Sequence, residues 1–191
     1  SNLKLKIGIY SRLFKSISQL DFYHRLVELL KSKGIDCYLY EDLARHLKEE
    51  HHISSGLETF HAKNIEQDSL DYLISLGGDG TMLDTLYIVK NTGIPVLGVN
   101  TGRFGFLASS QMSEIENTIL ELQNKSYAIE ERTVLRLESE EELFGNFPYA
   151  LNDFVLHKKD TSSMITVHTY LNGVFLNSYW ADGLIISTPT G

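Results

Sequence analysis

A glycine-rich loop that holds a single carboxylate is the feature of this sequence best suited to chemistry. Residues 77–81 read Gly-Gly-Asp-Gly-Thr and directly follow a strand-like run at residues 72–76. Glycines let a phosphate approach the backbone closely. A helix that starts at Thr81 would point its free N–H groups and positive dipole end at that phosphate. The pattern favours a phosphate-binding loop over the plainer alternative, a strand–turn–helix corner with Asp79 as the N-cap.

The loop differs from the two common nucleotide-binding fingerprints. The Rossmann pattern G-x-G-x-x-G fails at Leu83, and no Gly-Lys pair of a P-loop follows. A second glycine-containing loop, residues 100–107, follows another apolar run at residues 96–99. Ligands bind at the carboxyl ends of the strands of an open parallel sheet, so we expect both loops at one rim of such a sheet.

Alternating strand and helix signals surround these loops in the first two thirds of the chain. Apolar runs predict strands at residues 5–10, 35–40, 72–76 and 96–99, and apolar stripes or caps predict helices within residues 22–33, 41–50, 81–90 and 115–122. Gly34 stands where a helix C-cap is expected. The polar, aperiodic residues 51–69 predict a loop. Strands separated by helices indicate a mostly parallel sheet covered by helices.

The pattern changes near residue 126. Strand-like runs then follow one another, at residues 133–137, 150–157, 165–171, 174–179 and 184–187, with Asn172-Gly173 as a hairpin signal. Aromatic residues at strand spacings here predict a core. We therefore expect the α/β class, with an N-terminal parallel-sheet α/β domain at residues 1–125 that carries the loop. Residues 126–191 then form the start of a β-rich second domain.

Charge and composition exclude several kinds of partner. The formal net charge is −8, with 42% hydrophobic and 22% charged residues and a lone cysteine, Cys37, for which a buried apolar role is expected. An acidic chain without a Lys/Arg cluster is a poor ligand for nucleic acid or for an anionic membrane. Without a signal-peptide pattern or a long apolar stretch, a cytoplasmic location is expected. The histidines between residues 46 and 61 lack regular ligand spacing, which predicts a solvated loop and no metal site.

At four segments, in order, the sequence resembles the NAD kinases. Gly-Gly-Asp-Gly-Thr is shared by NAD kinases, diacylglycerol-type lipid kinases and phosphofructokinases. Lipid kinases usually place Asn-Glu almost directly after it, where this chain has Met82-Leu83-Asp84. Residues 100–107, the pair Asn152-Asp153 and residues 182–191 match the NAD kinases in order, and the last match is the most specific.

The resemblance implies an enzyme that transfers the γ-phosphoryl group of ATP to the adenosine 2′-hydroxyl of NAD and so makes NADP, with Mg²⁺ or another divalent cation. It makes Asp79 the general base, with Gly80 beside it in the substrate-binding loop. A lipid or sugar kinase of the same superfamily, or a non-catalytic nucleotide-binding module, remains as an alternative.

The remaining site residues follow from the same resemblance. Phe106 would lie against the adenine, Asn152 and Asp153 would bind adenine and ribose polar groups, and Asp182 would contact the nicotinamide end from a neighbouring subunit. A homo-oligomer, dimer or tetramer, with the NAD site between the two domains is therefore expected. Relatives often carry a basic residue where this chain has Trp180, and many have Glu at the position of Asp153. The chain is expected to stop before the family's last substrate-contacting segment, so that these 191 residues alone are inactive.

Overall fold

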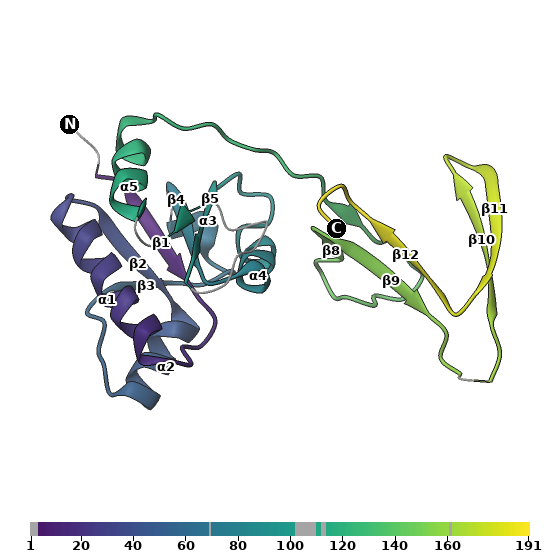
Figure 1. Ribbon diagram of the computed structural model, residues 1–191, viewed down its shortest axis with the longest axis horizontal. Helices are drawn as coiled ribbons and strands as arrows, with labels where there is room; N and C mark the ends of the chain where they lie inside the picture. Colours follow the sequence, from purple (N-terminus) through teal and green to yellow (C-terminus); the bar gives the residue numbers. More distant parts are fainter. Residues whose placement is uncertain (1–3, 69, 102–109, 112–113, 161) are drawn as a thin grey trace. The chain divides into compact units, whose positions relative to one another are not determined.

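Six parallel strands form the sheet of the first part of the chain (Figure 1). The structure, a computed structural model, describes residues 4–68, 70–101, 110–111, 114–160 and 162–191. The strand order is β3-β2-β1-β4-β5-β6. These strands are β1 (Lys6–Tyr10), β2 (Asp36–Tyr40), β3 (Glu58–Phe60), β4 (Tyr72–Leu76), β5 (Val96–Asn100) and β6 (Ser110–Gln111). The order reverses between β1 and β4, and ligands bind at such a reversal, outside the carboxyl ends of the strands.

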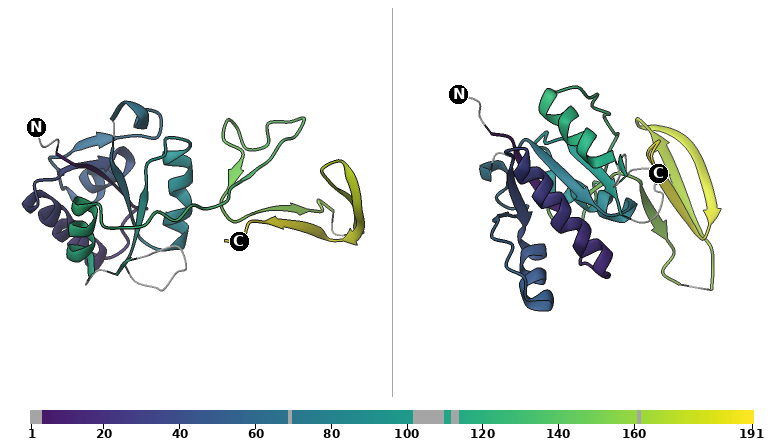
Figure 2. Two further views of the ribbon diagram at one scale, coloured as in Figure 1. Left: turned by 90° about the horizontal axis from the view of Figure 1, so that it is seen from above. Right: turned by 60° about the vertical axis from the view of Figure 1, so that its left-hand side comes forward.

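Helices cover both faces of this sheet (Figure 2). They are α1 (Ile17–Ser32), α2 (Glu41–His51), α3 (Ile65–Asp68), α4 (Asp79–Val89) and α5 (Ile115–Asn124). Neighbouring residues of β4 point to opposite faces: Ile74 packs in the core with α1, α2 and α5, whereas Leu73 packs with Ile65 of α3 and Ile88 of α4. All five residues of β4 are buried, as expected for a central parallel strand.

The first helix begins and ends where its sequence directs. Ser16 caps α1 by accepting a hydrogen bond from the N–H of Gln19. At the other end Gly34 adopts a φ of 73°, the N–H of Ile35 donates to the carbonyl of Leu30, and the chain turns directly into β2. This is a Schellman motif, and the predicted glycine stop is confirmed.

The predicted loop at residues 51–69 is wrong in part, because it contains β3 and α3. β3 is an edge strand of three residues, anchored by Phe60, which is 2% exposed. A run of three residues shows no periodicity that sequence reasoning can detect. Two of the histidines expected in a solvated loop, His46 and His51, instead lie on α2 with their rings in contact.

The chain divides into two units, residues 1–129 and 130–191. The second unit contains three antiparallel strand pairs. They are β7 (Leu135–Arg136) with β8 (Tyr149–Ala150), β9 (Asp153–His157) with β12 (Gly183–Ser187), and β10 (Ile165–Leu171) with β11 (Val174–Ala181). Asn172 and Gly173 both have positive φ, 50° and 81°, as a two-residue hairpin turn requires. The predicted hairpin is confirmed.

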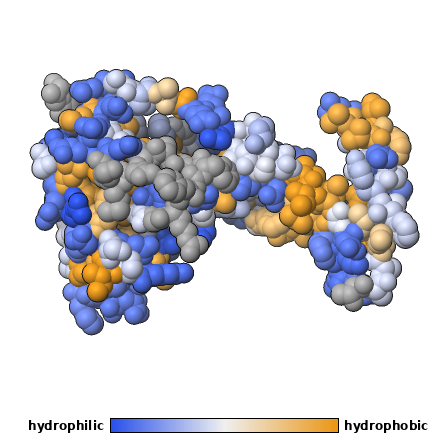
Figure 3. Space-filling model, in the orientation of Figure 1, coloured by the Kyte–Doolittle hydropathy of each residue, from blue (hydrophilic) through white to orange (hydrophobic). Residues whose placement is uncertain are grey.

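Apolar side chains of the second unit lie at its surface (Figure 3). Among its described residues only Thr188 is buried. The prediction that its aromatic residues form a core is therefore wrong for Tyr170 and Phe175, which contact each other edge-on but remain exposed. Strand spacing shows which residues share a face but does not show whether another layer covers that face.

Candidate functional site

The glycine-rich loop joins β4 to α4 and is closely packed. Gly78 is the N-cap of α4 and Asp79 is its first residue. The helix thus begins two residues before its predicted start, and the alternative with Asp79 as N-cap is wrong. Gly77 donates its N–H to the carbonyl of Val99 at 2.9 Å, and a Cβ at Gly77 would lie 2.4 Å from Oγ1 of Thr81. Only glycine fits there without displacing the first turn of α4.

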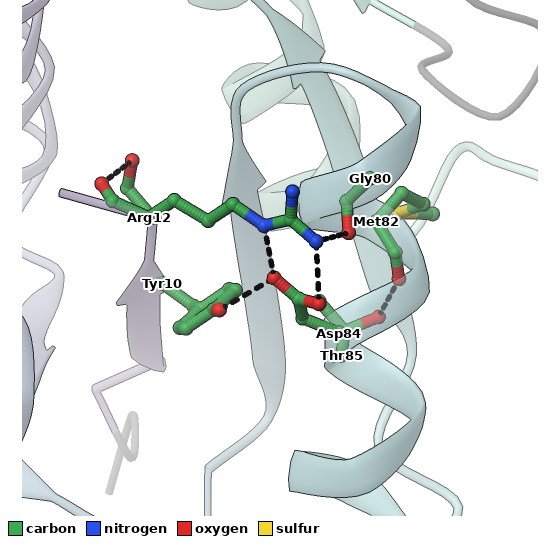
Figure 4. Close-up of polar contacts among 7 residues, drawn as sticks. Tyr10, Arg12, Gly80, Met82, Asp84 and Thr85 are labelled. Carbon is green, nitrogen blue, oxygen red and sulfur yellow. Dashed lines mark hydrogen bonds and ion pairs between the residues drawn. The ribbon is translucent and has the colours of Figure 1, made fainter. Parts of the chain in front are cut away.

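The loop that follows β1 adds a charged cluster, which sequence reasoning missed (Figure 4). Arg12 donates from Nε to Oδ2 of Asp84 at 2.6 Å and from Nη2 to Oδ1 at 2.8 Å. The same Nη2 donates to the carbonyl oxygen of Gly80 at 3.0 Å. Tyr10 donates its hydroxyl to Oδ2 of Asp84 at 2.8 Å. The carboxyl edge at the β1–β4 reversal therefore combines a glycine loop, a carboxylate and a guanidinium group.

The cluster keeps Tyr10 and Arg12 protonated. Burial, followed by the hydrogen bond to Asp84, raises the pKa of Tyr10, so the hydroxyl remains a donor. The hydrogen bond to Asp84 raises the pKa of Arg12. The signal that would have found Arg12 is positional: two polar residues, Ser11 and Arg12, directly follow a buried strand. This signal identifies a site residue only when the neighbour of β1 is known, and that neighbour is β4.

In the second unit, Asn152 and Asp153 lie against the carboxyl-terminal motif of the chain. Asp153 pairs with Ser187 in the β9–β12 register. Thr188, 5% exposed, donates its N–H to the carbonyl of Asn152 at 2.8 Å. Within the part of the chain that the structure describes, Oδ1 of Asn152 is buried and accepts no hydrogen bond. A buried unsatisfied acceptor costs about 1–3 kcal/mol, so this oxygen is suited to a ligand donor.

Asp182 lies at the other end of the same strand pair. Its Oδ1 is 2.6 Å from Nζ of Lys158, whose side chain is 15% exposed. The hydrogen bond from Lys158 holds the pKa of Asp182 below its usual value. Asp182 lies five positions before Ser187, the partner of Asp153, which is about 17 Å along an extended strand. The strand pair thus has the adjacent residues Asn152 and Asp153 at one end and Asp182 at the other.

Phe106, predicted to lie against the adenine, is outside the described residues. Over the described ranges, no three His, Cys, Asp or Glu side chains are grouped as metal ligands. In the same ranges, no helix is long and apolar enough to cross a membrane.

Comparisons with known proteins match both units. Residues 11–127 match the ATP-NAD kinase N-terminal domain, and residues 151–191 match the ATP-NAD kinase C-terminal domain. An NAD kinase of Cytophaga hutchinsonii is 41% identical, over 96% of this chain and 63% of the relative. An NAD kinase of Flavobacterium psychrophilum is 42% identical, over 98% of this chain and 64% of the relative. The chain thus spans just under two thirds of the length of these relatives.

Solved structures share the fold. The crystal structure of yeast NADH kinase in complex with NADH matches with a TM-score of 0.80 at 23% identity. The match covers 100% of this chain and 59% of the yeast chain. An NAD kinase of Archaeoglobus fulgidus in complex with ATP has a TM-score of 0.64 at 21% identity, with coverages of 96% and 60%. The predicted class, a parallel-sheet α/β unit followed by a β-rich one, is confirmed. From the two domain matches and the relatives near 40% identity, the chain belongs to the NAD kinase family.

Proposed function

We propose that the protein is an NAD kinase, which transfers the γ-phosphoryl group of ATP to the adenosine 2′-hydroxyl of NAD and releases NADP. The observation that carries this proposal is the loop at the β1–β4 reversal, where Asp79 occupies the first turn of α4 behind two glycines. Family membership supports it, and the alternatives, a lipid or sugar kinase or a non-catalytic module, are not favoured.

The loop suits the positioning that phosphoryl transfer demands. This reaction needs mainly alignment of its two substrates and stabilisation of charge on the transferred group. The first hydrogen bond of α4 runs from Met82 N to the carbonyl of Gly78. The N–H groups of Gly80 and Thr81 come before Met82, in the first turn of the helix, and N–H groups in a first turn attract phosphate oxygens. Gly80 thereby contributes backbone to the binding of substrate.

Asp79 is the general base of this proposal. Its place in the first turn of a packed helix fixes the direction from which the carboxylate approaches a substrate. It orients the 2′-hydroxyl of NAD for attack and accepts the proton that this hydroxyl loses. The oxygen then bonds to the γ-phosphorus of ATP, and ADP leaves.

Mg²⁺ or another divalent cation accompanies ATP in this proposal. A carboxylate oxygen such as that of Asp79 is the kind of ligand Mg²⁺ prefers, and Mg²⁺ usually takes one or two carboxylates together with substrate phosphates. The described residues hold no group of three acidic, His or Cys ligands, which fits a cation bound chiefly by the phosphates. When bound, the cation neutralises charge on the triphosphate.

NAD recognition is assigned to the second unit and to Phe106. Asn152 binds a polar group of NAD, and its buried, unsatisfied Oδ1 supports this role. Asp153 accepts from a ribose hydroxyl, and Phe106 lies against the adenine. Asp182 contacts the nicotinamide end of the NAD that a neighbouring subunit holds, and the match of residues 151–191 to the family's C-terminal domain supports this role. The proposal therefore includes a homo-oligomer, and we add to it a cytoplasmic location.

A substrate panel tests the function. The complete gene product is incubated with ATP and Mg²⁺ and with NAD, NADH, diacylglycerol or fructose 6-phosphate in turn. We expect NADP to form from NAD, measured with an NADP-specific dehydrogenase. Turnover of diacylglycerol or fructose 6-phosphate with NAD untouched would make the protein a different kinase. Binding without any turnover would make it a non-catalytic module.

A further inference from the structure

We propose that Arg12 binds the triphosphate of the phosphoryl donor and that Asp84 is the residue that positions it. This inference rests on the proposed NAD kinase function and deepens it, because it assigns to the donor a residue outside the glycine loop. Its basis is the cluster of Tyr10, Arg12, Gly80 and Asp84 (Figure 4).

Arg12 lies beside the glycine loop because their strands are neighbours. Tyr10, the last residue of β1, is in register with Ser75 of β4. The two loops that follow leave the sheet side by side at its carboxyl edge. The contact is direct: Nη2 of Arg12 donates to the carbonyl oxygen of Gly80, and a Cβ at Gly80 would lie 2.8 Å from Nη1 of Arg12. The guanidinium group thus occupies the space that glycine leaves at this position.

Three hydrogen bonds hold the guanidinium group and leave one amino group available. A guanidinium group has five N–H donors in a planar fork. Nε donates to Asp84, and Nη2 donates to both Asp84 and Gly80. Among the described residues, Nη1 has no hydrogen-bond partner, and the side chain is 59% exposed. Two N–H donors therefore remain for a ligand that enters the loop.

Asp84 gives this group a fixed orientation. Its carboxylate accepts from Nε and Nη2 of Arg12 and from the hydroxyl of Tyr10, and it stands on α4. The ring of Tyr10 packs edge-on against Tyr40 at 5.1 Å. A guanidinium fork that is held in place loses little conformational freedom when it binds, and it matches the geometry of phosphate oxygens. The ligand chemistry that fits is the phosphate chain of a nucleoside triphosphate.

A purely structural ion pair between the loop after β1 and α4 is the competing explanation, and kinetics separate the two. In the complete protein, Arg12→Met is expected to raise the KM for ATP by about ten- to a hundredfold, the value of a charge-assisted hydrogen bond. The KM for NAD should change by less than about twofold. Arg12→Lys keeps the charge but loses the fork, so its KM for ATP should lie between those of wild type and Arg12→Met. Asp84→Asn should raise the same KM by a smaller factor.

Inorganic tripolyphosphate tests binding of the phosphate chain without the nucleoside. Its inhibition constant in competition with ATP should rise in Arg12→Met by the same factor as the KM for ATP. Arg25→Met is the matched control, because Arg25 is an exposed arginine paired with Asp21 on α1. It should leave both constants unchanged.

The outcomes distinguish this inference from the function on which it rests. An unchanged KM for ATP, or equal rises in the KM for ATP and NAD, would overturn the role of Arg12 and leave the NAD kinase function standing. If wild type forms no NADP, the function fails. Calorimetric binding of tripolyphosphate to wild type and Arg12→Met then decides the role of Arg12 by itself. Thermal unfolding checks that each variant folds. If Arg12→Met does not fold, Arg12→Lys replaces it in these measurements.

Discussion

At the scale of single residues, the site relies on groups whose directions are fixed by their neighbours. Asp79 stands in the first turn of α4, Asp84 lies five residues later on the same helix, and Arg12 is held between Asp84 and the carbonyl of Gly80. Asp79 and Asp84 have different tasks on this helix. Asp84 is engaged by three donors and orients Arg12, whereas Asp79 is assigned to the substrate hydroxyl.

Asp79→Asn should lower kcat by about a hundredfold or more, because a positioned base is lost. The KM for NAD should change less, since the amide still forms hydrogen bonds. Asp71→Asn is the control: Asp71 accepts the N–H of Lys6 before β4, at the opposite end of that strand from the glycine loop. A near-normal kcat with a large rise in KM would show that Asp79 only binds substrate.

Lys158→Met should return the pKa of Asp182 toward its usual value. The pKa is lowered in the folded protein, so the ion pair stabilises the fold above the unfolded value of about 4. This stabilisation is lost as pH falls through the lowered folded value. Carboxyl NMR titration measures the shift directly. A titration of Asp182 that is identical in both proteins would remove the role assigned to Lys158.

At the scale of elements, the turn from β4 into α4 controls the site. Gly77→Ala should destabilise the protein by about 1–3 kcal/mol, because the added Cβ overlaps Thr81. It should also lower kcat, since the first turn of α4 must shift. Gly78→Ala is the matched control for stability, because a Cβ there meets nothing within 4 Å. Chemical unfolding compares the two variants and steady-state kinetics check Gly77→Ala; an equal loss of stability in both would show that the packing at Gly77 is not the cause.

The elements also show what could be predicted from sequence. β1, β2, β4 and β5 have enough apolar residues to be recognised. Gly34 after α1 and Asn172-Gly173 between β10 and β11 mark turns through chemistry that is local. β3 could not be predicted, because three residues show no period. Arg12 could not be predicted because its importance depends on the pairing of β1 with β4, which joins residues far apart in sequence.

At the scale of the whole molecule, the proposed contact of Asp182 with the NAD of a neighbouring subunit implies an oligomer. This contact is proposed from the family resemblance of residues 182–191. We therefore expect the active form to be a dimer or tetramer in sedimentation. A fully active monomer would contradict this expectation.

Subunit mixing tests the shared site directly. Asp79→Asn and Asp182→Asn, each weakly active alone, are unfolded together and refolded as a mixture. If Asp182 acts on the neighbouring subunit's substrate, mixed dimers contain one intact site, and activity should recover to about a quarter of wild type for random pairing across a two-fold interface. No recovery, with mixed oligomers demonstrated by differential tagging, would place Asp182 in its own subunit's site.

The position of the transferred phosphoryl group shows whether NAD is phosphorylated at its adenosine 2′-oxygen. The complete protein is incubated with ATP labelled with ³²P at the γ-phosphorus, together with NAD and Mg²⁺, and the labelled product is isolated and examined by ³¹P NMR. We expect label on NAD at the adenosine 2′-oxygen, and its near loss in Asp79→Asn. Label on another acceptor, or on another oxygen of NAD, would show that the protein is not an NAD 2′-kinase.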